Sequence, residues 1–157
     1  MIIELIWIAK TKEKFVSLGL AKYLERLAGI VRIKITEIDT DKKSNKEKAD
    51  IIKSKEAEEI IKRLSKGDYI IALDERGKQF SSIELSSLVN NLQNQAYKKI
   101  VFIIGGSLGL DKKVLDKANL VVSLSHLTFP HQLVRLILVE QIYRAFTILR
   151  GEPYHRQ

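Results

Sequence analysis

The sequence of 157 residues contains no cysteine. This absence excludes disulfide bonds and thiolate metal sites, and it is typical of proteins in a reducing compartment. No apolar run approaches the roughly 20 residues that a membrane-spanning helix needs. The first nine residues are apolar except for Glu4, and no basic segment precedes them, so they indicate a buried strand rather than a signal peptide. We therefore expect a cytoplasmic protein without membrane association.

Several cofactor motifs are also missing. There is no Walker sequence, and Gly105-Gly106-Ser107-Leu108-Gly109 does not have the spacing of the G-x-G-x-x-G fingerprint. No predicted helix carries His or Asp residues at the spacing of metal ligands. These absences predict that the protein holds no metal. Together with the short chain, they also disfavour a nucleotide-binding oxidoreductase.

Positive charge is in excess, with a formal net charge of +8 and an isoelectric point near 9.6. A charge of this size attracts polyanions such as the phosphate backbone of a nucleic acid. Lysine-rich surfaces are also ordinary, so the charge alone does not identify a partner. Each half of the sequence, 1–80 and 81–157, carries +4. Any nucleic-acid surface must therefore be built into the folded domain and not into a basic tail.

Apolar runs and amphipathic segments alternate along the whole chain, as expected for strands and helices in turn. The expected strands are 1–9, 31–38, 68–74, 100–104 and 120–124, and the expected helices are 10–28, 49–64, 82–97, a short one after Gly106, and 131–149. This order predicts one α/β domain over residues 1–157, with a mainly parallel sheet flanked by helices. Residues 39–48 contain no apolar side chain and are predicted to be a mobile, solvated loop, and residues 75–80 are predicted to be a loop.

Two of the expected strands end in loops rich in small and polar residues. The first is Gly105 to Gly109 and the second is Ser125 to Pro130. Ligands of open α/β sheets bind at the carboxyl ends of strands. Adjacent glycines alone are explained by a tight turn, but the second loop adds hydroxyl groups and the apolar side chains of Leu127 and Phe129. The pair of loops predicts a pocket for a small, flat cofactor, with His131 as either a ligand contact or a packing residue.

The last helix is apolar around its whole circumference, which predicts burial on all sides. In a domain of this size, one side must face the sheet, and we expect the other to contact a second subunit in a homodimer. Four polar residues interrupt the helix: Arg135, Glu140, Gln141 and Arg144. Because buried charges persist only when paired, they indicate either a network or a site.

Five segments together resemble the SPOUT-class methyltransferases, and in particular the ribosomal large-subunit methyltransferase H family. They are LDERGK (73–78), IGGSLGL (104–110), LTFPHQLVR (127–135), EQIYRA (140–145) and GEPYHR (151–156). The resemblance extends over the full chain. It implies a SPOUT fold with a deep C-terminal trefoil knot at about 99–150. It also implies an enzyme that uses S-adenosylmethionine to methylate N3 of a pseudouridine in 23S rRNA, with free rRNA or the ribosome as its partner.

The resemblance further implies which residues contact the cofactor: Leu73, Gly105, Leu124, Ser125, His126, Leu127, Thr128 and Phe129. We expect Tyr154, His155 and Arg156 to serve catalysis, because a phenol, an imidazole and a guanidinium offer a donor, a base and a clamp. A merely solvated tail is the alternative. Arg135, Arg144 and Arg156 are the expected RNA contacts. The rival hypothesis for the whole protein is a non-catalytic RNA- or ribosome-binding module on the same fold.

Overall fold

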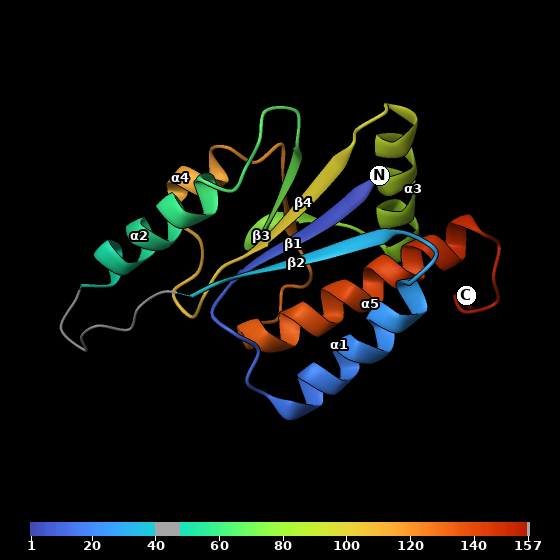
Figure 1. Cartoon of the computed structure of the whole chain (residues 1–157), viewed down its shortest axis with the longest axis horizontal. Coiled ribbons are helices and arrows are strands. Elements are labelled where there is room, and N and C mark those ends of the chain that lie inside the picture. The colour runs from blue at the N-terminus through green and yellow to red at the C-terminus, as the bar shows by residue number, and fades with distance from the viewer. Residues whose placement is uncertain (40–47, 157) are drawn as a thin grey trace.

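The computed structural model describes residues 1–39 and 48–156, and most of the predicted mobile loop at 39–48 lies outside these ranges. Strands and helices alternate along the described chain (Figure 1): β1 (Ile2–Ile8), α1 (Lys14–Leu27), β2 (Arg32–Ile38), α2 (Ala49–Ile61), β3 (Tyr69–Gln79), α3 (Ser82–Asn94), β4 (Lys99–Ile104), α4 (Lys112–Leu115), β5 (Leu120–Ser123) and α5 (His131–Leu149). The strands form one five-stranded sheet in the order β2-β1-β4-β3-β5, and every neighbouring pair is parallel. The predicted α/β architecture is confirmed.

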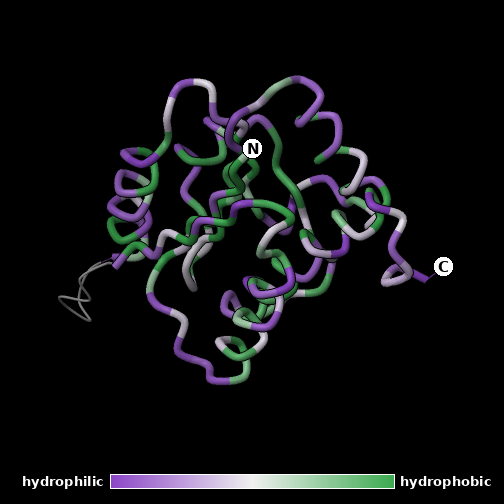
Figure 2. Tube along the Cα trace, turned by 45° about the vertical axis from the view of Figure 1, so that its right-hand side comes forward, coloured by the Kyte–Doolittle hydropathy of each residue, from purple (hydrophilic) through white to green (hydrophobic). Residues whose placement is uncertain are grey.

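The helices cover the two faces of the sheet as separate layers (Figure 1). α1, α3 and α5 pack on one face, where Ile3, Leu5 and Trp7 of β1 are buried. α2 and α4 pack on the other face, over Ile6 and Ile8. This division follows from the strand period of two, which sends successive side chains to opposite faces. Figure 2 shows the hydrophobic residues concentrated along the central strands.

Local signals place the helix ends. Ser81 caps α3 with a capping box, in which its hydroxyl accepts from the Glu84 backbone N–H and the Glu84 carboxylate accepts from the Ser81 N–H. α1 begins at Lys14 rather than Lys10, because residues 10–13 form a separately anchored segment. In α2, Ile51 is 47% exposed, whereas Glu56 is buried.

β3 is longer than the sequence predicts. Its second part, expected to be a loop, continues as strand to Gln79 and pairs with β5 after a register shift between Leu73 and Lys78. Gly77 lies in this second part, against the backbone of Val122. The prediction was wrong because the pairing partner lies more than 40 residues away in the sequence, so no local pattern reports it.

α5 lies between α1 and α3 on its face of the sheet. α1 approaches it closely, since a Cβ on Gly19 would stand 2.7 Å from Cδ1 of Leu136. On the outer surface of α1, Phe15 and Leu18 are 58% and 63% exposed. Across the described residues, none of the helices combines the length and the apolar character required to cross a membrane.

Candidate functional site

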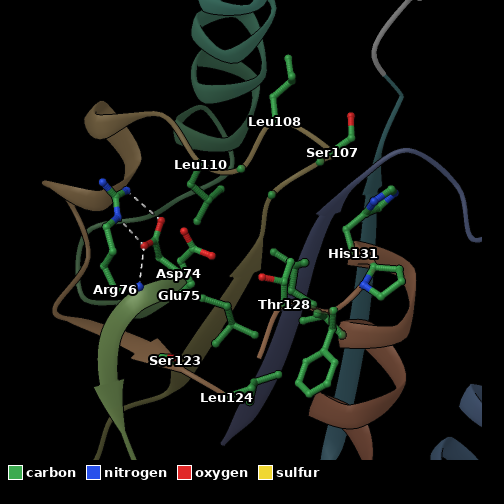
Figure 3. A pocket seen from close by; sticks show the side chains of 18 of the residues that line it. Asp74, Glu75, Arg76, Ser107, Leu108, Leu110, Ser123, Leu124, Thr128 and His131 are labelled. Carbon is green, nitrogen blue, oxygen red and sulfur yellow. Dashed lines mark hydrogen bonds and ion pairs between the residues drawn. The ribbon is translucent and has the colours of Figure 1, made fainter. Parts of the chain in front are cut away.

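A cavity of about 500 Å³ opens at the carboxyl ends of β3, β4 and β5 (Figure 3). This is the edge where ligands bind in open α/β sheets. Three loops and the first turn of α5 enclose it, and α2 adds one side chain. The lining residues are Lys53, Leu73, Asp74, Glu75, Arg76, Ile104, Gly105, Gly106, Ser107, Leu108, Gly109, Leu110, Val122, Ser123, Leu124, Ser125, Leu127, Thr128, Phe129, Pro130, His131 and Val134.

The glycine loop after β4 folds back on itself. Gly109 N–H donates to the Gly106 carbonyl at 3.1 Å, and Gly109 has a φ of 76°. A Cβ on Gly105 would lie 2.7 Å from the Gly109 carbonyl carbon. Gly105 is therefore required by the closure of its own loop, which agrees with the tight turn expected from the adjacent glycines. The loop offers its main chain to the cavity with few side chains in between.

The second loop joins β5 to α5 and is held by its own hydroxyl groups. The Ser123 hydroxyl donates to the Ser125 carbonyl at 2.9 Å, and the Ser125 hydroxyl accepts from the Leu127 N–H at 3.0 Å. Pro130 then precedes the first helical residue, a position where its missing N–H costs nothing. This arrangement leaves Leu127 71% exposed, at the mouth of the cavity.

Charged side chains line the side of the cavity formed by β3. The Asp74 carboxylate accepts from the Arg76 backbone N–H at 3.0 Å and from its guanidinium at 2.9 and 3.1 Å (Figure 3). The hydrogen bonds from the Arg76 side chain are the main cause that lowers the pKa of Asp74 below its ordinary value. Asp74 is thus a fixed negative charge at neutral pH. Lys53, from α2, lines the same cavity, and its positive charge also lowers the pKa of Asp74.

Glu56 lies just behind the glycine loop. Its carboxylate oxygens are 3.4 and 3.5 Å from the position that a Cβ on Gly106 would occupy. Burial raises the pKa of Glu56 above its ordinary value, against a smaller opposing effect of Lys53. No pattern in the sequence indicates that Lys53 or Glu56 lies near the site, because α2 is distant from the site residues along the chain.

Seven of the eight residues expected to contact a cofactor line this single cavity: Leu73, Gly105, Leu124, Ser125, Leu127, Thr128 and Phe129. His126 is exposed and lies outside the lining. His131, which the sequence left open, is part of the lining. The structure therefore brings together residues from the ends of three strands.

The three tail residues lie elsewhere. Tyr154 packs edge-on against Tyr143, and its hydroxyl lies 3.2 Å from the Tyr23 hydroxyl and donates to Glu140 at 3.0 Å. These contacts fix the tail at the carboxyl end of α5, whereas the cavity is at the amino end. A helix of 19 residues separates the two by about 28 Å. Within one chain, the tail does not reach the cavity.

Glu140 and Arg144 organise the tail contacts. The Glu140 carboxylate forms an ion pair with Arg144, whose guanidinium stacks 4.7 Å from the ring of Tyr154. Arg144 also lies 3.3 Å from Nδ1 of His155, and since arginine only donates, Nδ1 is the acceptor. Burial is the main cause that raises the pKa of Tyr154, and hydrogen bonds with Tyr23 and Glu140 raise it further. The phenol therefore remains protonated and acts as a donor.

Arg135 is not placed to contact RNA. It is fully buried, and its guanidinium donates to the Ile8 carbonyl at 2.6 Å and to the Thr11 hydroxyl at 2.8 Å. It also lies over the ring of Trp7 at 5.0 Å. The expected RNA contact is corrected to a structural role, because an arginine in an apolar helix can be satisfied by backbone carbonyls that the sequence does not reveal. Arg144 is half-buried in its ion pair, and Arg156 is exposed.

No group of three or more His, Cys, Asp or Glu side chains suited to a metal ion occurs within residues 1–39 and 48–156. The cavity itself offers backbone amides, hydroxyls, apolar walls and the paired charges around Asp74. Such a site can hold a molecule that combines an apolar ring with polar and cationic groups.

Comparison with known proteins places the chain among methyltransferases. A family profile described as "Predicted SPOUT methyltransferase" matches residues 1–155. The chain is 43% identical to ribosomal RNA large subunit methyltransferase H of Halothermothrix orenii, covering 99% of this chain and all of that protein. It is 44% identical to the protein of the same name from Finegoldia magna, with the same coverage.

Two solved structures share the fold at low sequence identity. A probable methylase family protein from Haemophilus influenzae aligns with a TM-score of 0.53 and 17% identity, over 99% of this chain and 70% of that one. A probable methyltransferase from Bordetella pertussis aligns with a TM-score of 0.54 and 10% identity, over 92% and 95%.

Proposed function

The chain belongs to the SPOUT methyltransferase family, and we propose that it methylates N3 of a pseudouridine in large-subunit ribosomal RNA, using S-adenosylmethionine. The observation that carries the proposal is the convergence on one cavity of seven residues that the family resemblance implies as cofactor contacts, from the ends of three strands. The full-length similarity to proteins named ribosomal RNA large subunit methyltransferase H supports rRNA as the substrate. We also propose that the chain adopts the C-terminal trefoil knot of this family and works in the cytoplasm.

The residues at the cavity suit the cofactor. Leu73, Leu127 and Phe129 offer apolar surface to an adenine ring, and the main chain of the glycine loop offers donors and acceptors. Asp74, held ionised by Arg76, suits the positive charge of an ammonium or sulfonium group. When bound, S-adenosylmethionine supplies an electrophilic methyl group on a positively charged sulfur.

The protein must supply alignment and a path for one proton. N3 of pseudouridine carries a weakly acidic proton, which a base takes as the nitrogen forms its bond to the methyl carbon and the carbon–sulfur bond breaks. Tyr154, whose phenol stays protonated, orients the target as a donor once its O–H is released from Glu140. His155 can serve as the base through Nδ1 once Nδ1 is released from Arg144, because Nε2 carries the proton of the neutral ring when Nδ1 accepts. Arg156 is exposed and suits a phosphate.

A second subunit brings its own tail to the cavity, which the tail of the same chain does not reach. In a two-fold homodimer that pairs α5 with its copy in antiparallel orientation, the carboxyl end of one helix lies near the amino end of the other. The exposed apolar side chains of Phe15 and Leu18, beside α5, suit such an interface. The tail of each chain then completes the cavity of its partner, and Arg144 and Arg156 lie near the bound RNA.

The decisive experiment is methyl transfer from tritiated S-adenosylmethionine to unmethylated ribosomes, followed by mapping of the labelled nucleotide. Label on N3 of one pseudouridine in the large-subunit rRNA is the expected result, and free rRNA and isolated subunits tested in parallel identify the preferred substrate. Ribosome binding without any label would favour the alternative, a non-catalytic ribosome-binding module. Label on another atom or another RNA would contradict the proposed target.

A further inference from the structure

Residues 9–14, which comprise the connection from β1 to α1 and the first residue of α1, are held at the edge of the cavity by side chains from other elements. Its first residue, Ala9, has a φ of 64°, a backbone conformation that non-glycine residues rarely adopt. Such a conformation persists only when surrounding contacts determine it. Those contacts come from α5 and β2, and they are specific to the main chain of this segment.

Three side chains provide the anchors. Gln132 accepts from the backbone N–H groups of both Lys12 and Glu13 at 2.9 Å. Arg135 donates to the Thr11 hydroxyl and to the Ile8 carbonyl, which ends β1. Glu37 of β2 accepts from the Thr11 N–H at 3.2 Å. The segment is thus a fixed element of the structure, although it contains no regular helix or strand.

The anchors also fix the position of the segment relative to the cavity. Gln132 follows His131 directly, and His131, Pro130 and Val134 line the cavity. At the other end, Ile8 lies next to the glycine loop, since its Cγ2 is 3.4 Å from the position of a Cβ on Gly106. In Figure 3 the blue chain that leaves β1 curves away beside His131. The segment therefore lies beside the cavity, outside its lining residues, and forms an outer rim.

This rim carries three lysines. Lys10, Lys12 and Lys14 are all exposed, and Glu13 is the one acidic residue among them. Within the described parts of the chain, no side-chain hydrogen bond or ion pair engages these three ammonium groups. Some other exposed cations pair with a nearby carboxylate, such as Lys62 with Glu59 and Lys112 with Asp116. The lysines at 10–14 keep their charge available for a partner.

We propose that residues 10–14 form a preset phosphate-binding rim, which holds the RNA backbone next to the target nucleotide through Lys10, Lys12 and Lys14. This inference rests on the proposed function and adds to it the surface that the RNA uses. Ammonium groups on a fixed main chain bind phosphates with a smaller loss of conformational entropy than those on a mobile loop. Arg135 and Gln132 act as positioning residues, because they hold the rim without touching the RNA.

The test compares two double variants that remove the same charge. Lys10→Ala/Lys12→Ala alters the rim, and Lys66→Ala/Lys98→Ala removes two exposed lysines that precede β3 and β4, at the opposite edge of the parallel sheet. Each protein is assayed for methyl transfer to unmethylated ribosomes over a range of salt concentrations. Thermal stabilisation by S-adenosylmethionine is measured as a second readout that does not involve RNA.

The rim variant should raise KM for ribosomes by on the order of tenfold, roughly threefold for each lost phosphate contact. It should lower the slope of log KM against log salt by about 1 to 2, while kcat and the stabilisation by the cofactor stay unchanged. The control pair should leave KM and the slope near the wild-type values. Equal effects of both pairs would show that only the overall charge matters and would overturn the inference.

The outcomes separate this inference from the function beneath it. If the wild-type protein labels ribosomes and the rim variant does so with unchanged KM and salt slope, the rim has no role and the proposed function stands. If the wild-type protein labels no ribosome under any condition, the proposed function fails, and the assignment of the rim to the RNA fails with it. A variant that loses stabilisation by the cofactor would place the rim in cofactor binding and contradict the assignment.

Discussion

Gly77 of β3 lies directly against the backbone of Val122 of β5: a Cβ at position 77 would stand 2.6 Å from the carbonyl carbon of Val122 and 2.7 Å from its nitrogen. Real Cβ atoms do not approach backbone so closely. This contact is where the second part of β3 crosses to its pairing with β5, beside the cavity. Glycine is required here for space, and not for an unusual φ angle.

Gly77→Ala is therefore expected to destabilise the fold by about 3 kcal/mol, because two strands must move apart to admit the methyl group. The measurement is the free energy of unfolding in urea. Gly19→Ala is the matched control. Its Cβ would also meet an atom at 2.7 Å, but that atom is the flexible end of Leu136, and alanine favours the helix by up to about 1 kcal/mol. Equal losses at the two positions would contradict this reasoning.

The contacts of Glu4 lead us to expect that the free energy of unfolding depends on pH in the acidic range. Its buried carboxylate accepts from Thr36 at 2.7 Å and pairs with Lys34 and Lys99 at 2.7 and 3.1 Å. Burial by itself raises the pKa of Glu4, but the hydrogen bonds from these three partners outweigh it, and the pKa is lowered below 4.5. The stability that the ionised group contributes is thus fully present above pH 4.5 and is lost as pH falls through the lower pKa of the folded protein.

Replacing Glu4 tests this linkage. Glu4→Gln should lower the free energy of unfolding at pH 7 by about 2 kcal/mol, because the buried carboxylate loses its charge-assisted hydrogen bonds with Lys34 and Lys99, whereas Lys99 keeps its ion pair with Asp68. The variant should also lose less stability than the wild type between pH 5 and pH 3. Glu59→Gln, which removes a carboxylate paired on the surface of α2, is the control and should change the acid dependence little. Parallel pH profiles for Glu4→Gln and the wild type would show that Glu4 does not set the acid sensitivity.

Substitution of Gly105 is expected to abolish cofactor binding. A hundredfold excess of S-adenosylmethionine over its dissociation constant should stabilise the wild-type fold by about 2.7 kcal/mol, and NADH or ATP should do far less. Gly105→Val should abolish this effect, because its side chain would force the loop away from Gly109. The unliganded variant should remain folded by circular dichroism, since the loop lies at the edge of the sheet. Equal stabilisation by all three ligands would argue against a specific site.

If the tail of one subunit completes the cavity of its partner, two inactive variants should restore activity when they are mixed. Deleting residues 154–157 should cut methyl transfer by on the order of a hundredfold while cofactor binding stays nearly intact. Mixing this truncated protein with full-length Gly105→Val should restore activity, because the mixed dimer combines an intact cavity with an intact tail from its partner. A tail that acted within its own chain would give no recovery. Wild-type activity of the truncated protein alone would show that the tail has no catalytic role.

The alternation of apolar runs and amphipathic segments was enough to predict the parallel sheet and its helices. Strand and helix periods depend on local backbone geometry, so they can be recognised in the sequence. The two loops after β4 and β5 were also recognisable in the sequence, from their small and polar residues. Seven residues of the candidate site were named from the family resemblance, and they line one cavity because the carboxyl ends of parallel strands meet at one edge.

Tertiary structure decided what depends on distant partners. The sequence did not show that residues 75–79 pair with β5, that Arg135 is buried against the end of β1, or that Lys53 reaches the cavity from α2. Sequence reasoning also assigned the tail and the two loops to one functional site, whereas the length of α5 separates them within a chain. Each of these outcomes depends on which surfaces meet after the chain has crossed the sheet. Such contacts join residues that are far apart in the sequence, so a local sequence pattern does not predict them.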